Sequence, residues 1–180
     1  MTFLDGGWCT PLVVALVIAA GPLRADPGLR VGPRGGVDLR NGADPYVGVE
    51  LRLSFSRSPL TINPTFDHLF DAKATLYRVG VNALYYLPVP IRRVDPYVGV
   101  GVNVTSFSLK EATPDVDNSG SRVGMSLVAG ACLEVPFVSP FVQIAKHFGE
   151  FDPLSLGAGL VVALDRQADD RWNGCGGLVR

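Results

Sequence analysis

Residues 98–105, Val-Gly-Val-Gly-Val-Asn-Val-Thr, carry an apolar side chain at every second position. Successive side chains of a β-strand point to opposite faces of the sheet, so this stretch predicts a strand with two unlike faces. The four valines share one face, and the glycines, Asn103 and Thr105 share the other. The stretch therefore predicts a strand that touches an apolar medium on one side and a crowded or polar space on the other.

The same alternation recurs from about Leu29 to Leu164 and predicts eight strands in all. Several of them reach the roughly 9 to 11 residues that a tilted strand needs to cross a bilayer. Gly, Pro, Asn and Asp gather between them, as turns require. The remaining seven strands are predicted over Leu29–Leu39, Tyr46–Phe55, Leu60–Phe70, Thr75–Leu87, Arg122–Glu134, Pro140–His147 and Leu154–Leu164.

The composition indicates where the apolar faces point. Apolar residues make up 47% of the chain and charged residues only 18%, and the mean hydropathy is +0.26. Beyond the N-terminus, no apolar run approaches the roughly 18 residues of a spanning helix. The polar faces are rich in glycine, which suits the interior of a narrow barrel. We therefore expect an all-β protein, an eight-stranded antiparallel up-and-down transmembrane β-barrel with its apolar rows in lipid.

Nine charged residues fall on the faces predicted to line the lumen, five positive and four negative. Nearly balanced charge in a closed interior can form paired, hydrogen-bonded networks, which avoids the high cost of an unpaired buried ion. The hypothesis is that these side chains form an ion-pair network that plugs the lumen. They are Arg30, Arg34, Asp38, Glu50, Arg52, Asp67, Arg78, Arg122 and Glu134.

The two ends of the chain are expected to lie outside the barrel. Residues 1–25 are interpreted as a signal peptide, because an apolar stretch over Pro11–Ala20 is followed by small residues. The barrel is assigned to residues 26–165, and residues 166–180 are expected to form an unstructured tail. Residues 110–120 are the longest predicted loop and face outward if the N-terminus is periplasmic.

The three cysteines are dispersed. Cys9 lies in the leader, Cys132 in a predicted strand and Cys175 in the tail. A Cys132–Cys175 disulfide is conceivable in an oxidising periplasm, but two unrelated thiols are the favoured interpretation.

The sequence contains few residues arranged as metal-binding, nucleic-acid-binding or catalytic sites require. The two histidines, His68 and His147, are isolated and there is no Cys-x-x-Cys pair, so neither a metal nor another cofactor is expected. The net charge of −1 provides no basic surface for nucleic acid. His147 could meet Ser106, Ser108 or Ser155 as in a lipid-modifying hydrolase. A lone His at a strand end is more often structural, so no catalytic residue is assigned.

Two further patterns concern the aromatic residues. The hexapeptide Asp-Pro-Tyr-Val-Gly-Val occurs at Asp44–Val49 and again at Asp95–Val100. A duplicated hairpin would explain it, but a recurrent way to start a strand after a turn is the favoured interpretation. Aromatic residues near predicted strand ends are candidates for interfacial girdles or for plain packing. They are Tyr46, Phe55, Phe66, Phe70, Tyr85, Tyr86, Tyr97, Phe107, Phe141 and Phe148.

The leader, the glycine-punctuated strands at residues 96–101 and 130–134, and the segment Pro140-Phe141-Val142-Gln143 resemble small outer-membrane β-barrels of the OmpA and OmpX kind, often labelled porin-like. The resemblance covers roughly Leu29 to Leu164. It departs from the pattern at the end, because such barrels usually finish on an aromatic residue, whereas here sixteen residues, 165–180, follow Leu164.

The resemblance implies an integral protein of the bacterial outer membrane, exported through the periplasm, with a role in envelope integrity, adhesion or surface interaction. Its implied partners are outer-membrane lipid, lipopolysaccharide and, during insertion, the barrel-assembly machinery. Two alternatives stay open: a narrow passive pore, and a soluble lipocalin-like barrel that binds an apolar ligand. The soluble barrel would turn the valines of residues 98–104 inward and Arg52, Arg78 and Asn103 outward.

Overall fold

The computed structural model describes residues 28–39, 43–55, 58–71, 74–89, 93–109, 119–133, 135, 138–149 and 153–164. These ranges contain eight strands. The strands are β1 (Gly28–Asp38), β2 (Asp44–Ser54), β3 (Leu60–Phe70), β4 (Ala74–Tyr86), β5 (Val94–Leu109), β6 (Ser119–Leu133), β7 (Val138–Phe148) and β8 (Leu154–Ala163).

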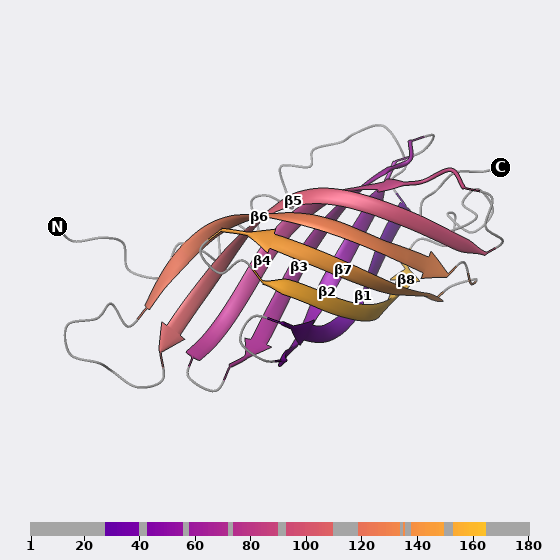
Figure 1. Ribbon diagram of the computed structural model, residues 1–180. Helices are drawn as coiled ribbons and strands as arrows, with labels where there is room; N and C mark the ends of the chain where they lie inside the picture. Colours follow the sequence, from indigo (N-terminus) through magenta and orange to yellow (C-terminus); the bar gives the residue numbers. More distant parts are fainter. Residues whose placement is uncertain are drawn as a thin grey trace.

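Each strand pairs with the next in antiparallel register, and β8 pairs with β1 to close the barrel (Figure 1). The ladder β1–β8 includes Arg30↔Ala163 and Asp38↔Ser155, so the closing seam runs along almost the whole of both strands. The predicted eight-stranded antiparallel barrel is thus confirmed. Closure leaves no sheet edge with unpaired backbone groups. Within the described residues no helix has the length and apolarity to span a membrane.

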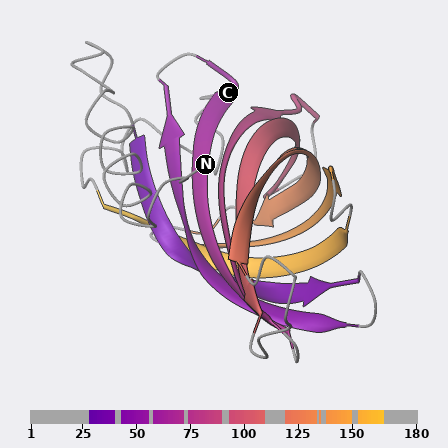
Figure 2. The ribbon, with the colours of Figure 1, turned by 90° about the vertical axis from the view of Figure 1, so that its left-hand side faces the viewer.

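The alternation of the sequence sets which side of the wall each residue occupies. In β5, Val100 is 55% exposed on the outside, whereas Asn103 and Thr105 are buried inside. Viewed from one end, the strands curve around a central space (Figure 2), and that space contains the buried polar side chains. The apolar rows therefore face outward and the polar rows inward, which is the reverse of the arrangement expected for a lipocalin-like soluble barrel.

The two ends of the barrel are named by the strand termini that lie at them. We call the end where β1 begins and β8 finishes the terminal end, and the opposite end the distal end. β5 and β6 are longer than predicted, with sixteen and fifteen residues. They pair without interruption from Val94↔Leu133 at the terminal end to Ser108↔Ser119 at the distal end. This hairpin is therefore the tallest part of the wall.

The aromatic candidates divide between packing inside the barrel and exposure on its outer surface. Four of them point into the barrel and are buried there, namely Tyr46, Tyr86, Tyr97 and Phe141. Others do lie on the outer surface, namely Phe66, Phe70, Tyr85 and Phe148, together with Tyr77, which was not predicted. Position along a strand indicates closeness to the interface, whereas the face of each residue follows from the period-two alternation.

The cysteine interpretation requires correction. Cys132 is wholly buried and its sulfur is disulfide-bonded. The favoured interpretation, that Cys132 and Cys175 are unrelated free thiols, is therefore wrong for Cys132. Its partner lies outside the described residues. The predicted signal peptide and C-terminal tail also lie outside them.

Candidate functional site in the lumen

Glu50 of β2 is the central acid of the lumen. Its side chain is fully buried, and one carboxylate oxygen accepts a hydrogen bond from Arg52 Nε at 2.6 Å. The other oxygen lies 3.5 Å from Arg34 Nη1. Two guanidinium groups from neighbouring strands thus share one carboxylate. Such charge-assisted contacts offset the cost of burying three ions only when they are all kept together.

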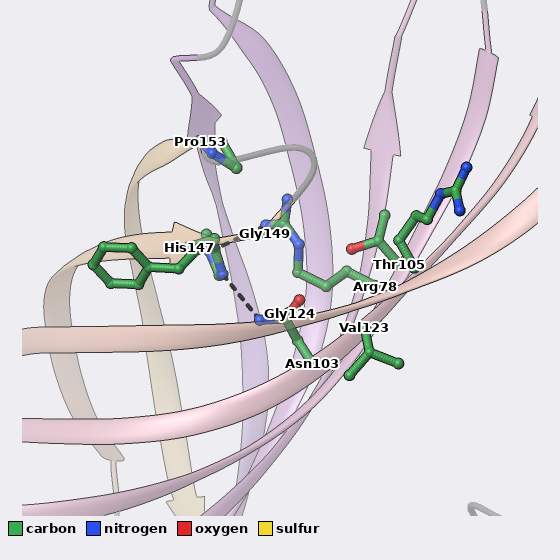
Figure 3. A pocket seen from close by; sticks show the side chains of 10 residues that line it. Arg78, Asn103, Thr105, Val123, Gly124, His147, Gly149 and Pro153 are labelled. Carbon is green, nitrogen blue, oxygen red and sulfur yellow. Dashed lines mark hydrogen bonds between the residues drawn. The ribbon is translucent and has the colours of Figure 1, made fainter.

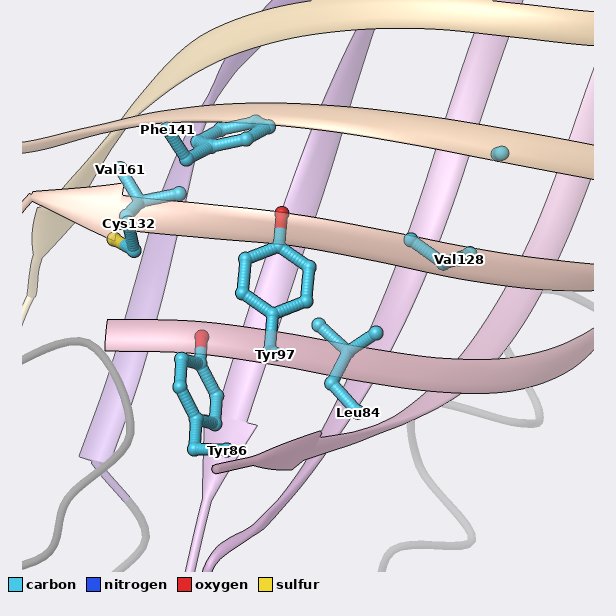
Figure 4. Packing of buried hydrophobic residues seen from close by; sticks show 8 residues of the cluster. Leu84, Tyr86, Tyr97, Val128, Cys132, Phe141 and Val161 are labelled. Atoms are coloured by element: carbon cyan, nitrogen blue, oxygen red, sulfur yellow. The ribbon is translucent and has the colours of Figure 1, made fainter. Parts of the chain in front are cut away.

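Arg52 connects this acid to the terminal end. Its Nη1 donates to the Tyr86 hydroxyl at 2.9 Å, and its guanidinium lies 5.2 Å from the Tyr97 ring centre and 4.3 Å from that of Phe141. These distances suit cation–π attraction in a desolvated site. The three rings belong to an apolar cluster at the terminal end (Figure 4), which also contains Leu84, Val128, Cys132, Ala145 and Val161.

Arg34 connects the same acid to the distal end. Its Nε lies 3.0 Å from an oxygen of Asp67, and its guanidinium lies 5.5 Å from the centre of the Tyr46 ring. Tyr46 packs in a second apolar cluster with Leu69, Ala74 and Leu76. The charged groups therefore lie between two apolar clusters, one at each end of the lumen.

The repeated hexapeptide places equivalent tyrosines at these two ends. Tyr46 is the first buried residue of β2, at the distal end, and Tyr97 is the first buried residue of β5, at the terminal end. Each ring contacts one arginine, Arg34 or Arg52. Each also packs where a glycine leaves room: Tyr46 against Gly157 of β8, and Tyr97 against Gly130 of the adjacent strand β6. The repeat thus has a shared structural role, whether or not it arose by duplication.

A polar relay crosses the middle of the lumen. Ser126 Oγ of β6 donates to Asn82 Oδ1 at 2.8 Å, and Asn82 Nδ2 donates to Asn63 Oδ1 at 3.3 Å. Asn63 in turn donates to the carbonyl oxygen of Leu51 at 2.8 Å. The relay links β6, β4, β3 and β2, so it holds opposite parts of the wall at a fixed separation.

A small pocket lies inside the distal end (Figure 3), between β4, β5, β6 and β7. Arg78 lines it and pairs with Asp38 at 2.9 Å. The His147 ring contacts Arg78 Nη1 at 3.3 Å, Asn103 Nδ2 at 3.4 Å and Ser155 Oγ at 3.3 Å. These contacts fix the imidazole in a structural hydrogen-bond network.

The structure brings together six of the nine predicted lumen residues in two groups, Arg34, Glu50, Arg52 and Asp67 in one and Asp38 and Arg78 in the other. Arg30 lies at the terminal end and donates to Ser139 Oγ at 3.0 Å. Arg122 lines the distal pocket. Glu134 lies outside the described residues.

Charge alone does not identify the uncharged residues of the site. The inward aromatic rings of Tyr46, Tyr86, Tyr97 and Phe141 contact or flank the arginines, and Gln143 lies within 3.3 Å of the Tyr97 hydroxyl. The alternation alone was sufficient to find them, because each shares its face with residues already assigned to the lumen.

The arrangement separates the residues considered for catalysis. Ser106 and Ser108 lie on the outward row of β5, with Ser106 paired to Ser121 at 2.9 Å, whereas His147 lines the pocket inside. Ser155 does reach His147, but it is buried. No group of three or more metal-ligating side chains occurs within the described ranges.

Comparison with known proteins agrees with the architecture. A family described as the outer membrane protein beta-barrel domain matches residues 14–137. The N-terminal β-barrel domain of Pseudomonas aeruginosa OprF is similar in structure, with a TM-score of 0.61, 13% identity, and coverage of 75% of this chain and 96% of that chain. Ail, the attachment invasion locus protein of Yersinia pestis, gives a TM-score of 0.50, 12% identity, and coverage of 77% and 97%. No curated protein matches the chain. At these identities, the structural likeness concerns the fold.

Proposed function

This chain belongs to the outer membrane protein beta-barrel domain family, and we propose that it is a non-conducting, non-enzymatic barrel with a structural, envelope-integrity or surface-interaction role. The observation that supports the proposal is the charged group inside the barrel, in which Glu50 joins Arg34 to Arg52 between two apolar clusters. A barrel of eight strands is only just wide enough for its own side chains. Its interior therefore serves as a core.

The chemistry of this core opposes ion passage. A permeating ion needs water or polar groups to replace its hydration shell, and the cost of removing that shell in a low-dielectric space is high. At the terminal end, the Arg52 guanidinium is wholly buried against Tyr97 and Phe141. This region presents a fixed positive charge and apolar rings in place of a hydrated path, so it disfavours the alternative of a narrow passive pore.

Single-channel recording of the purified barrel in planar bilayers tests the proposal. The expected result is no steady ohmic conductance. As a positive control, the variant Arg52→Ala/Tyr97→Ala removes side chains from the terminal half of the lumen and should gain conductance. The lipid-facing variant Val100→Ala should remain silent. Large, stable, ohmic conductance of the wild-type protein would overturn the plugged lumen and favour the pore.

The outer surface supports the proposed location in the bacterial outer membrane. His68 packs edge-on against Phe70 with ring centres 4.6 Å apart and lies 4.8 Å from Tyr77. Tyr77 also stacks on Phe66 at 6.0 Å. Amphipathic rings of this kind suit the interface between lipid and water. We infer that the barrel is exported through the periplasm, inserted by the barrel-assembly machinery, and surrounded by outer-membrane lipid and lipopolysaccharide.

Cell fractionation tests this location. The protein should require detergent for extraction, and the folded barrel should migrate faster than the boiled protein on a gel. A mature protein that stays monomeric in water without amphiphile would contradict the membrane assignment. The same membranes provide the test for catalysis: we expect no deacylation or acyl transfer on lipopolysaccharide, with His147→Ala giving an identical background.

A further inference from the structure

Cys132 lies where the barrel meets its terminal end. It is the last residue but one of β6, it is 0% exposed, and its neighbours in the apolar cluster include Phe141 and Val161 (Figure 4). Phe141 is its direct partner in the β6–β7 ladder. The sulfur of Cys132 is nevertheless disulfide-bonded, so a second segment of the chain must reach this inward-facing position.

The choice of partner is narrow, because the chain has three cysteines. The other two, Cys9 and Cys175, both lie outside the described residues. Cys175 follows the last residue of β8, Ala163, by twelve positions (175 − 163). Twelve residues span up to roughly 40 Å when extended. Since Val161 of β8 already packs in the same cluster as Cys132, a segment leaving β8 has ample length to return to that end of the lumen.

We propose that Cys132 and Cys175 form a disulfide that fastens the C-terminal segment, residues 165–180, to the terminal end of the barrel. Cys9 is the weaker partner because it precedes the apolar stretch of the leader, which export would remove. The proposal gives residues 165–180, which follow the last strand, a place at the terminal end of the barrel. It does not depend on whether the lumen conducts.

The bond requires an oxidant. The two thiols release two protons, and their two electrons reduce the disulfide form of a thiol oxidoreductase to its dithiol while the Cys132–Cys175 bond forms. Such an oxidant is available in an oxidising compartment such as the periplasm. Because Cys132 is inaccessible in the folded barrel, the finished bond is expected to resist soluble reductants until the barrel is unfolded.

Peptide mapping of protein purified from outer membranes tests the proposal. The protein is unfolded with iodoacetamide present and no reductant, then cut with trypsin after Lys and Arg. Cys132 lies on the peptide Val123–Lys146 and Cys175 on Trp172–Arg180. The expected result is a cross-linked pair of these two peptides that separates on reduction. Recovery of Val123–Lys146 with a carbamidomethylated Cys132, or joined to a peptide containing Cys9, would overturn the proposal.

Two variants sharpen the test without disturbing the lumen. In Cys175→Ser, the Cys132 thiol should become free and should react with a maleimide reagent only after the barrel is unfolded by heat. In Cys9→Ser, the cross-linked pair should be unchanged. If Cys132 stays blocked in Cys175→Ser, the assigned partner is wrong. A soluble reductant applied to the folded wild-type protein should release less than a tenth of the thiol that it releases after heating.

Discussion

The ring of Tyr97 fills the space that a side chain on Gly130 would occupy. The two residues face each other in the β5–β6 ladder, and a Cβ built on Gly130 would lie 2.5 Å from Tyr97 Cζ and 2.6 Å from the carbonyl oxygen of Val142. Glycine is therefore required here for close packing. The ring in turn lies beside the Arg52 guanidinium, so this one contact connects the barrel wall to the charged core.

We predict that Gly130→Ala destabilises the folded barrel by about 1–3 kcal/mol, as overpacking of a tightly packed site generally does. The Tyr97 ring is packed beside Arg52, and the Val142 carbonyl belongs to the backbone of the wall. The measurement is the temperature at which the heat-modifiable band is lost. Gly35→Ala is the matched control, because its Cβ would come no closer than 3.2 Å to any atom. Equal midpoints for the two variants would contradict the prediction.

The Arg52–Glu50 pair should behave as a buried unit. We predict that Arg52→Met costs about 3–5 kcal/mol, because it leaves the Glu50 carboxylate buried with only the longer contact to Arg34. Adding Glu50→Gln removes the uncompensated charge and should recover part of this loss. A double-mutant cycle of urea unfolding in lipid vesicles measures the coupling. Strictly additive losses would show that the two groups do not act together.

The polar relay offers an uncharged test of the same core. We predict that Asn82→Leu destabilises the barrel by about 1–3 kcal/mol, since Ser126 loses its acceptor and Asn63 loses a donor while both side chains stay buried. The lipid-facing neighbour Val81 provides the control, and Val81→Leu should change stability little. The same unfolding experiment compares them. A neutral Asn82→Leu would mean that water satisfies these groups.

Much of the fold was predictable because a barrel wall separates two unlike environments at every residue. The valines of residues 98–104 and the glycines between them fixed the faces, and the structure confirms the eight strands. The length of the β5–β6 hairpin was harder to predict from the sequence. Its distal part carries Ser106, Ser108, Ser119 and Ser121, whose small polar side chains alternate weakly although their backbones continue the ladder.

The sequence predicts which residues face the lumen, but it does not predict which of them form ion pairs with one another. The sequence assigns Arg34, Glu50, Arg52 and Asp67 to one side of the wall, whereas the choice of partner depends on strand stagger and side-chain reach. Glu50 contacts arginines from both its own strand and β1. A disulfide of Cys132 was conceivable from the sequence but was not the favoured interpretation, because spacing along the chain carries no information about which cysteines meet in the fold.

The orientation of the wall yields the most general prediction. Val102 lies in the middle of β5 and is 57% exposed on the outer surface, so Val102→Lys would place an ammonium group in hydrocarbon. We predict a loss of about 2–4 kcal/mol in unfolding from lipid vesicles, as expected for a basic residue at the bilayer midplane. The control is Val138→Lys at the first position of β7, where a lysine can extend to the interface and should cost about 0–1 kcal/mol. If the two substitutions cost the same in vesicles, the valine row does not face lipid, and the assignment of the charged row to a closed interior fails with it.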